Sequence, residues 1–223
     1  MGERAARAVI KPRKRTVRRA RQARSRHTVE TILEGATRIL VERGWAGFTT
    51  NAVAERAGVS IGSLYEYFSC KGDLVDAIVD RHLSRAEQIV ADVDARMAEL
   101  HGPCLRLTPK ELVDMLVGTF VSLHSDDPLL HRVLSSQVPL TDAHRTRILA
   151  LQESAVDRVA TLLPLDVRSR DRTASMLVGT ADALIHAWIV EDGIPLPEES
   201  MRQEIGDMLS AFLGSKGDFP VYT

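Results

Sequence analysis

The chain has 223 residues, of which 44% are hydrophobic, 26% charged and only 4% aromatic. These proportions are typical of a water-soluble protein of one or two domains, and the two cysteines have no spacing typical of zinc or redox sites. No apolar run approaches the roughly 18 residues that a membrane span needs, and the first residues lack the apolar segment of a signal peptide. We therefore expect a cytoplasmic protein without membrane contacts.

The net charge of −1 conceals two oppositely charged regions. Residues 1–26 contain 11 Lys and Arg and one acidic residue, a net charge of +10, which leaves −11 for residues 27–223. Such dense like charge with little apolar content predicts a disordered basic arm over residues 1–24, which would attract DNA phosphates. A solubility tail, or a start site assigned too far upstream, would explain the same composition, and both alternatives stay open.

The folded part is predicted to begin with a helix over about residues 28–43. Its apolar residues recur at the 3.6-residue spacing of a helix face, and Gly44 is placed to end it. We expect Trp45 and Phe48 in the following loop to be packing residues, because large aromatic side chains beside a small helical core usually supply apolar area.

Residues 49–74 are the most informative segment of the sequence. Either Thr49 or Thr50 is expected to cap a short helix that Gly58 ends, and Ser60 to cap a second helix directly after it. Two short helices joined by a tight glycine turn form a helix-turn-helix, whose second helix enters the DNA major groove by its N-terminal residues. The small side chains of Gly62 and Ser63 would let this helix approach the base edges closely.

The rest of the chain is predicted to be helical. A long helix over residues 71–100 joins the helix-turn-helix to the remainder, and Thr108 with Glu111 forms a capping box for a helix over about residues 109–125. Further helices are expected over about residues 127–135, 142–163, 168–191 and 198–213. No strand-like alternation occurs, so the sequence predicts an all-α protein.

The helix-turn-helix segment resembles the DNA-binding signature of the TetR family of bacterial transcriptional regulators. The resemblance rests on the string Gly-Ser-Leu-Tyr-x-Tyr-Phe-x-x-Lys at residues 62–71, and flanking residues extend it over about residues 26–76. Cys70 and Gly72 depart from the polar and acidic residues that are usual there, at positions that do not face the groove. The resemblance implies an all-α chain in which a three-helix, helix-turn-helix DNA-binding domain precedes a larger helical domain for ligand binding and dimerisation.

The family pattern also implies a division of the chain and a set of DNA contacts. The domains would be a basic arm over 1–24, the DNA-binding domain over 25–72, the effector-binding and dimerisation domain over 73–215, and a tail over 216–223. Base contacts are implied for Ile61, Gly62 and Ser63, and phosphate contacts for Thr50, Tyr65, Tyr67 and Lys71. Hydroxyl and ammonium groups suit phosphate oxygens. Tyr65 could instead lie partly in the core, and Thr50 could do no more than cap its helix.

In this family a ligand cavity would lie between the central helices of the second domain. The candidate lining residues are Met115, Phe120, His124, Asp182, His186 and Trp188. Asp182 lies one helical turn before His186, so the two form either a locally satisfied hydrogen-bonded pair or the polar contact for an effector. The sequence does not indicate which small molecule this effector is.

The resemblance implies a homodimer, paired through the last two helices, that represses transcription from a palindromic operator in double-stranded DNA until a small-molecule effector binds. A ligand-dependent activator, a co-repressor-type regulator and a DNA-binding adaptor without a role in transcription would use the same helix-turn-helix. An enzyme is disfavoured, because no phosphate-binding glycine loop, nucleophile elbow or His-Glu-x-x-His helix occurs. The seven histidines are scattered along the sequence, and we predict no metal site and no cofactor.

Overall fold

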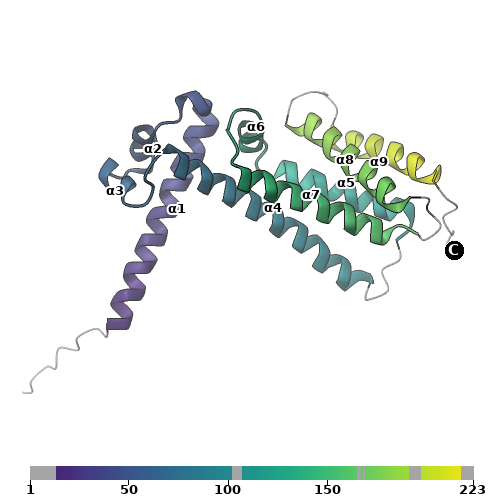
Figure 1. Cartoon of the computed structure of the whole chain (residues 1–223), viewed down its shortest axis with the longest axis horizontal. Coiled ribbons are helices and arrows are strands. Elements are labelled where there is room, and N and C mark those ends of the chain that lie inside the picture. Colours follow the sequence, from purple (N-terminus) through teal and green to yellow (C-terminus); the bar gives the residue numbers. More distant parts are fainter. Residues whose placement is uncertain (1–13, 102–106, 165–166, 168, 191–196, 217–223) are drawn as a thin grey trace, which may run out of the picture.

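The computed structural model describes residues 14–101, 107–164, 167, 169–190 and 197–216, with side chains from residue 24 to residue 99 in the first range. Over these residues the chain forms nine helices and no strand, which confirms the predicted all-α class (Figure 1). The helices are α1 (Lys14–Gly47), α2 (Thr50–Ala57), α3 (Ile61–Tyr65), α4 (Lys71–His101), α5 (Pro109–Ser125), α6 (Pro128–Ser136), α7 (Asp142–Leu162), α8 (Arg170–Ile189) and α9 (Glu198–Gly214). None of the described helices is long and apolar enough to span a membrane.

The first helix is longer than predicted. It begins at Lys14 instead of near residue 28, so residues 14–24 of the predicted disordered arm are helical, while residues 1–13 lie outside the described residues. These added turns are rich in Arg, which favours helix, and they elongate an existing helix without a new nucleation step. At Gly44 the backbone leaves the helical conformation, with φ 63° and ψ −175°, as the sequence predicts.

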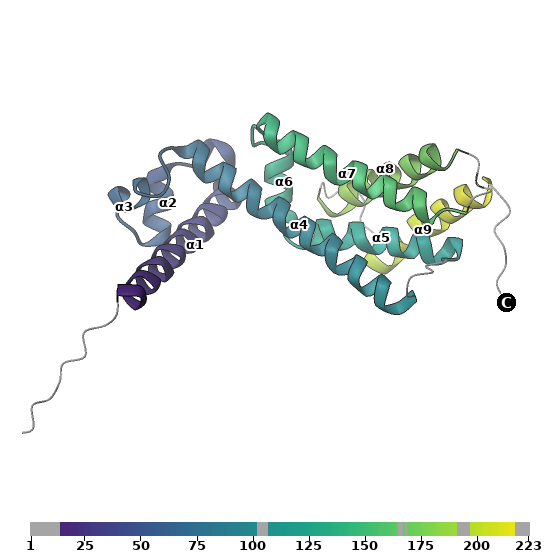
Figure 2. The ribbon, with the colours of Figure 1, turned by 60° about the horizontal axis from the view of Figure 1, so that its bottom comes forward.

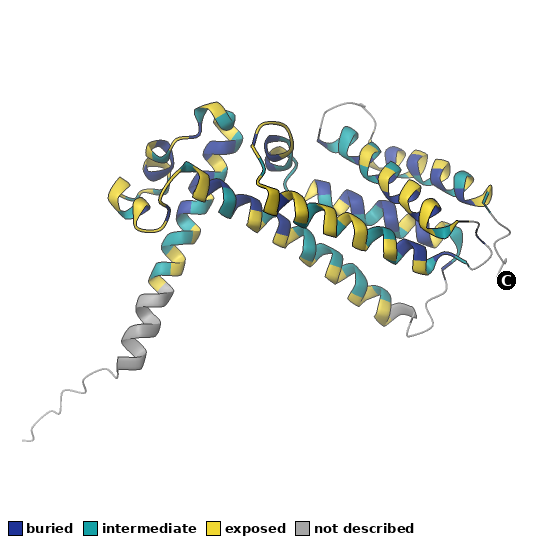
Figure 3. Ribbon diagram, in the orientation of Figure 1, coloured by how far each residue is buried: buried dark blue, intermediate teal, exposed yellow. Residues whose placement is uncertain are grey.

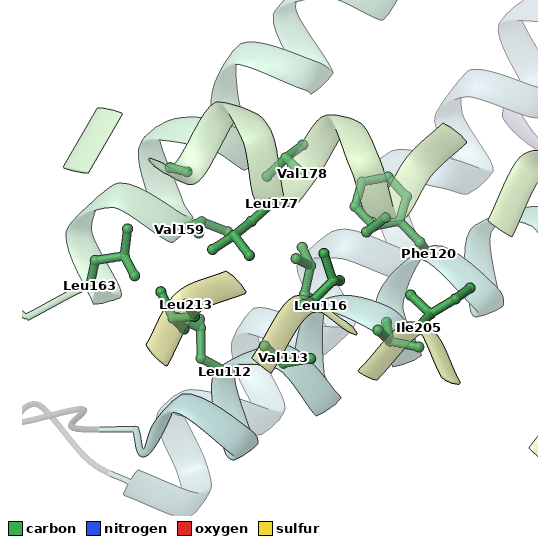
Figure 4. Packing of buried hydrophobic residues seen from close by; sticks show 14 of the residues in the cluster. Leu112, Val113, Leu116, Phe120, Val159, Leu163, Leu177, Val178, Ile205 and Leu213 are labelled. Carbon is green, nitrogen blue, oxygen red and sulfur yellow. The ribbon is translucent and has the colours of Figure 1, made fainter. Parts of the chain in front are cut away.

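The buried residues form two separate hydrophobic cores (Figure 3). The N-terminal core joins α1, α2, α3, the first turns of α4, and α6, and its fully buried side chains include Ile32, Leu40, Phe48, Leu64, Leu74 and Ile78. The C-terminal core joins α5, α7, α8 and α9, and Figure 4 shows Leu112, Leu116, Leu177, Ile205 and Leu213 packed together in it. Although α6 follows α5 in the chain, it therefore packs with the N-terminal helices.

Helix α4 runs from the N-terminal module (α1–α3) into the C-terminal bundle (Figure 2). Leu74 and Ile78 in its first turns are fully buried in the N-terminal core. Further along, it is fastened to α7, where Arg147 Nε lies 2.7 Å from Glu87 Oε1. Arg147 Nη1 also lies 3.2 Å from Asp80 Oδ1, so one guanidinium binds α4 at two points about two turns apart.

Helices α8 and α9 each have an inner and an outer face. The buried residues of α9 are spaced four apart, at Met201, Ile205, Leu209 and Leu213, and they face the C-terminal core. The buried row follows the four-residue spacing and leaves Met208 44% exposed at its edge. Met176 on α8 is likewise 49% exposed, so the outer faces of both helices carry apolar side chains.

Candidate nucleic-acid interface and ligand cavity

The turn between α2 and α3 is held by two helix caps and a left-handed glycine. Thr49 Oγ1 accepts a hydrogen bond of 3.2 Å from the Ala52 amide at the start of α2, and Gly58 ends this helix with φ 68°. Ser60 Oγ accepts a hydrogen bond of 3.0 Å from the Ser63 amide and so caps α3. Residues other than glycine rarely adopt the backbone conformation of Gly58, so the tight turn depends on this residue.

Short as it is, α3 is firmly anchored. Leu64 is fully buried in the N-terminal core, and Phe68 is buried after the helix has ended at Tyr65. The opposite side of α3 faces outward, where the exposed fractions of Ile61 and Tyr65 are 38% and 49%. A Cβ atom added at Gly62 would meet only Ser60 Oγ, at 3.8 Å, so this side of the helix is open to a large partner.

Most of the residues predicted to contact DNA lie together on this outward surface. Tyr67 is 36% exposed. The hydroxyls of Thr50 and Tyr65 are 3.1 Å apart, although they come from α2 and α3. Ser63 is half-buried, and its Oγ accepts a hydrogen bond of 2.9 Å from Ser60 Oγ. The surface therefore presents small and hydroxyl-bearing side chains at the start of α3, as a groove-reading helix requires.

Lys71 is an exception among the predicted DNA contacts. Its Nζ donates a hydrogen bond of 2.8 Å to the Trp45 carbonyl and lies 3.6 Å from the centroid of the Trp45 ring. Partial burial lowers the pKa of this lysine. The ring of Trp45 in turn stacks on Phe48 with centroids 6.2 Å apart, so the ammonium fastens the last turn of α1, beyond Gly44, to the start of α4.

The second site is a cavity of about 430 Å³ lined by residues of α4, α5, α6, α7 and α8. Its wall is largely apolar and includes Leu83 and Val93 from α4 and Ile148 from α7. Five of the six predicted lining residues, Met115, Phe120, His124, Asp182 and His186, lie on it. Trp188 does not line the cavity. It follows His186 by two residues, about 200° around the helix, and packs half-buried against the C-terminal core.

One end of the cavity contains a group of histidines that sequence reasoning missed. His82 from α4 and His131 from α6 join the predicted pair His124 and His186, so four of the seven histidines of the sequence lie together. His82 Nε2 is 3.1 Å from His131 Nδ1. The ring centroids of His124 and His131 are 4.8 Å apart, and those of His131 and His186 are 5.1 Å apart. We call these four residues the histidine cluster.

Burial controls the charge of the cluster. It lowers the pKa of His131 to about 3, with a further contribution from repulsion by His124 and His82. Burial also lowers the pKa of His82 and of His124. The pKa of Asp182 is raised by burial, against the attraction of His124 and His186. At neutral pH the imidazoles of His82, His124 and His131 are therefore uncharged, and such rings have a nitrogen lone pair to offer.

The opposite end of the cavity is polar as well. Arg158 Nη1 from α7 lies 2.7 Å from Asp94 Oδ1 of α4, and both residues line the wall. Along α4, Asp94 is about 18 Å from His82 at 1.5 Å per residue. The cavity thus has two polar ends and an apolar middle, which is the usual make-up of a small-molecule site.

Two family models match this chain. One, described as "Bacterial regulatory proteins, tetR family", matches residues 32–78, and the other, described as "Tetracyclin repressor-like, C-terminal domain", matches residues 108–213. Together the two matches cover more than half of the sequence. The chain belongs to the TetR family. Its N-terminal module is therefore the DNA-binding helix-turn-helix domain of a transcriptional regulator, as the resemblance of residues 62–71 implies.

Individual TetR-family proteins are similar over most or half of the chain. The HTH-type transcriptional regulator TtgR of Pseudomonas putida is 28% identical over 190 residues, which cover 78% of this chain and 85% of TtgR. The HTH-type transcriptional repressor KstR of Mycolicibacterium smegmatis is 30% identical over 112 residues, 50% of each chain. The crystal structure of a TetR transcription regulator from Haloarcula marismortui shares the fold, with a TM-score of 0.63 at 19% identity, and the match covers 86% of this chain and 99% of that one.

Proposed function

We propose that this TetR-family chain is a homodimeric repressor that leaves its operator when a small, largely apolar molecule enters the cavity. The observation that carries the proposal is the course of α4. Its first turns are buried in the N-terminal core through Leu74 and Ile78, and its middle lines the cavity through Val90 and Val93. A ligand that displaces the middle of α4 would tilt the helix-turn-helix with it.

On the DNA, α3 would enter the major groove. Ile61, Gly62 and Ser63 contact base edges, while the hydroxyls of Thr50, Tyr65 and Tyr67 contact phosphates and set the register. Lys71 has a different role in this proposal, because its ammonium is engaged by Trp45. It holds the last turn of α1, beyond Gly44, against the start of α4, and any phosphate contact is secondary to that.

The dimer would form through the outer faces of α8 and α9. Met176 and Met208 expose 49% and 44% of their surface there. Gly179 and Ala183 on α8 and Ala211 on α9 are also exposed, and small side chains let helices of two protomers approach closely. A two-fold dimer matches a palindromic operator whose half-sites lie about one helical turn or a multiple of it apart. Repression is favoured over activation by the likeness to KstR, a transcriptional repressor.

The effector would be a compact apolar molecule with at least one polar group. A volume of about 430 Å³ falls within the range of drug-sized sites, and most of the wall is hydrocarbon. The two polar ends, Asp94 with Arg158 and Asp182 with the histidine cluster, would fix the orientation of the bound molecule.

The test is binding of the purified chain to the DNA upstream of its own gene, compared with scrambled DNA of equal length at several salt concentrations. We expect operator binding at least 1,000-fold tighter than binding to scrambled DNA, in line with specific protein–DNA complexes. A reporter behind this DNA separates repression from activation, and light scattering gives the oligomeric state. Equal affinity for both DNAs would contradict a sequence-reading role.

A further inference from the structure

We infer that the histidine cluster is a binding site for one divalent transition-metal ion, held by His124, His131, His186 and Asp182 at the junction of the two cores. The three imidazoles each offer a ring nitrogen, and these nitrogens lie within 4.8 Å of one another. In a tetrahedral site with metal–nitrogen distances of about 2.0–2.1 Å, ligand atoms lie about 3.3 Å apart. Ring rotations that move each nitrogen inward by about 1 Å would close the site.

The hydrogen bonds around His124 prepare it for coordination. Its Nδ1 lies 2.8 Å from the Phe120 carbonyl oxygen, and a carbonyl can only accept, so Nδ1 carries the proton. The lone pair of the neutral ring is then on Nε2, which faces Asp182 Oδ1 at 3.4 Å. The two atoms can share either a proton or a metal ion, and a metal ion that binds here displaces the proton. Metal-binding histidines in proteins characteristically donate their other ring nitrogen to a carbonyl or carboxylate in this way.

His82 contacts one of the proposed ligands, His131, through a hydrogen bond. Its Nε2 lies 3.1 Å from Nδ1 of His131. In the tautomer in which His131 Nδ1 donates this hydrogen bond, Nε2 of His131 has the lone pair that an ion needs. Asp182 and His186 lie four residues apart on α8, a spacing that brings both side chains to one face of the helix. Imidazole nitrogens with one carboxylate favour Zn²⁺, Ni²⁺, Co²⁺ or Cu²⁺ over Mg²⁺ or Ca²⁺, which take oxygen ligands.

The position of the site gives the ion a regulatory consequence. His131 belongs to α6, whose Leu130, Val133 and Leu134 are buried in the N-terminal core. His124 and His186 belong to α5 and α8 of the C-terminal bundle. An ion held by all three helices would tie the DNA-binding side of the molecule to the effector side. This second step rests on the proposed function, whereas the metal site itself does not.

The test of the site uses the full chain without a histidine tag, freed of metal with a chelator and then titrated with Zn²⁺ against a fluorescent zinc indicator. We expect one Zn²⁺ per chain, and at least tenfold weaker binding in each of His124→Gln, His131→Gln and Asp182→Asn. The control is His27→Ala, which removes a histidine of α1 outside the cluster and leaves the affinity unchanged. Equal Zn²⁺ affinity in the wild type and in His131→Gln would overturn the site.

A measurement on the wild type alone covers the case in which the variants do not fold. Zn²⁺ should protect the half-buried His131 and His186 from diethylpyrocarbonate, read by mass spectrometry, and leave the exposed His27 reactive. If neither His131 nor His186 lost reactivity when Zn²⁺ is added, the site would be overturned. Mg²⁺ at the same concentration should give no protection.

Coupling is measured separately, as operator affinity with Zn²⁺ and with chelator. We expect a change of at least about fivefold in the wild type, the lower end of typical coupling between sites, and none in His131→Gln. An unchanged affinity would overturn the coupling and leave the metal site intact. A chain that binds Zn²⁺ but no DNA would instead contradict the proposed function.

Discussion

The two hydrophobic cores of this TetR-family chain differ in how completely they are filled. In the N-terminal core, Ile32, Leu40 and Phe48 expose none or almost none of their surface, and every helix of the module contributes to one continuous cluster. The C-terminal half also has a dense core, but between that core and α4 it holds a cavity of about 430 Å³. A protein fills a core for stability and leaves one open for a ligand, so the difference separates the rigid half from the responsive half.

One leucine-to-alanine substitution in the N-terminal core and one beside the cavity test this difference most directly. Leu40→Ala removes a fully buried side chain from the N-terminal core and should lower the free energy of unfolding by about 3–5 kcal/mol. Leu123→Ala removes a half-buried side chain that already borders the cavity, so less packing is lost, and we expect about 1–2 kcal/mol. Urea denaturation followed by circular dichroism measures both. Equal losses would mean that the cavity closes in solution.

The basic arm offers a change that should affect only the DNA-binding half. Deletion of residues 2–24 removes most of the +10 charge of residues 1–26 and no residue of the N-terminal core, whose first buried side chain is Ile32. We expect an unchanged fold and dimer, at least tenfold weaker DNA binding in low salt, and a salt slope reduced by several units. Fluorescence anisotropy at several salt concentrations measures both.

A matched variant separates charge from helix in the arm. Replacing Arg18, Arg19 and Arg21 by Gln keeps good helix formers in α1 and removes three charges. If the arm acts by charge, the slope should fall by up to about three units. An unchanged affinity in the deletion variant would assign the arm to solubility.

Filling the cavity should change the response to effector and leave DNA binding of the effector-free protein nearly unchanged. Val93 lines the cavity from α4, and Val93→Trp would occupy part of its volume. We expect the effector response to be lost or reduced. Operator affinity in the absence of effector should stay within about threefold of wild type, since Val93 is not part of the N-terminal core that holds the helix-turn-helix. Operator binding is measured with and without an effector identified by a thermal-shift screen of small apolar compounds. If the melting temperature of the variant also fell by many degrees, Val93 would be a core residue and the coupling would follow another route.

The two halves also differ in what the sequence reveals. The caps at Ser60 and Gly58 depend on residues adjacent in the chain, and so do the capping box at Thr108 and the bounds of α4 to α9, so all of these could be predicted locally. The start of α1 could not, because its first turns elongate a helix that is stabilised further along. The histidine cluster draws on α4, α5, α6 and α8, and no spacing along the chain records which helix faces pack together.

The smallest expected effects concern two polar side chains at the end of the helix-turn-helix, Tyr67 and Lys71. Tyr67 is exposed and makes no hydrogen bond through its hydroxyl among the described residues, so Tyr67→Phe should remove one phosphate contact without loss of stability. The affinities for operator and for scrambled DNA should fall alike, by a few-fold. Ser63→Ala, which changes the groove-facing end of α3, should reduce discrimination between the two DNAs more than affinity.

For Lys71 the sequence and the structure make different predictions. If Lys71 contacts a phosphate, Lys71→Ala should reduce the salt slope by about one unit and leave stability unchanged. If Lys71 joins the start of α4 to the Trp45 carbonyl and ring, the substitution should lower the free energy of unfolding by about 1 kcal/mol and leave the slope unchanged. We expect the second result. A slope reduced by one unit with unchanged stability would mean that the ammonium leaves Trp45 for a phosphate when DNA binds.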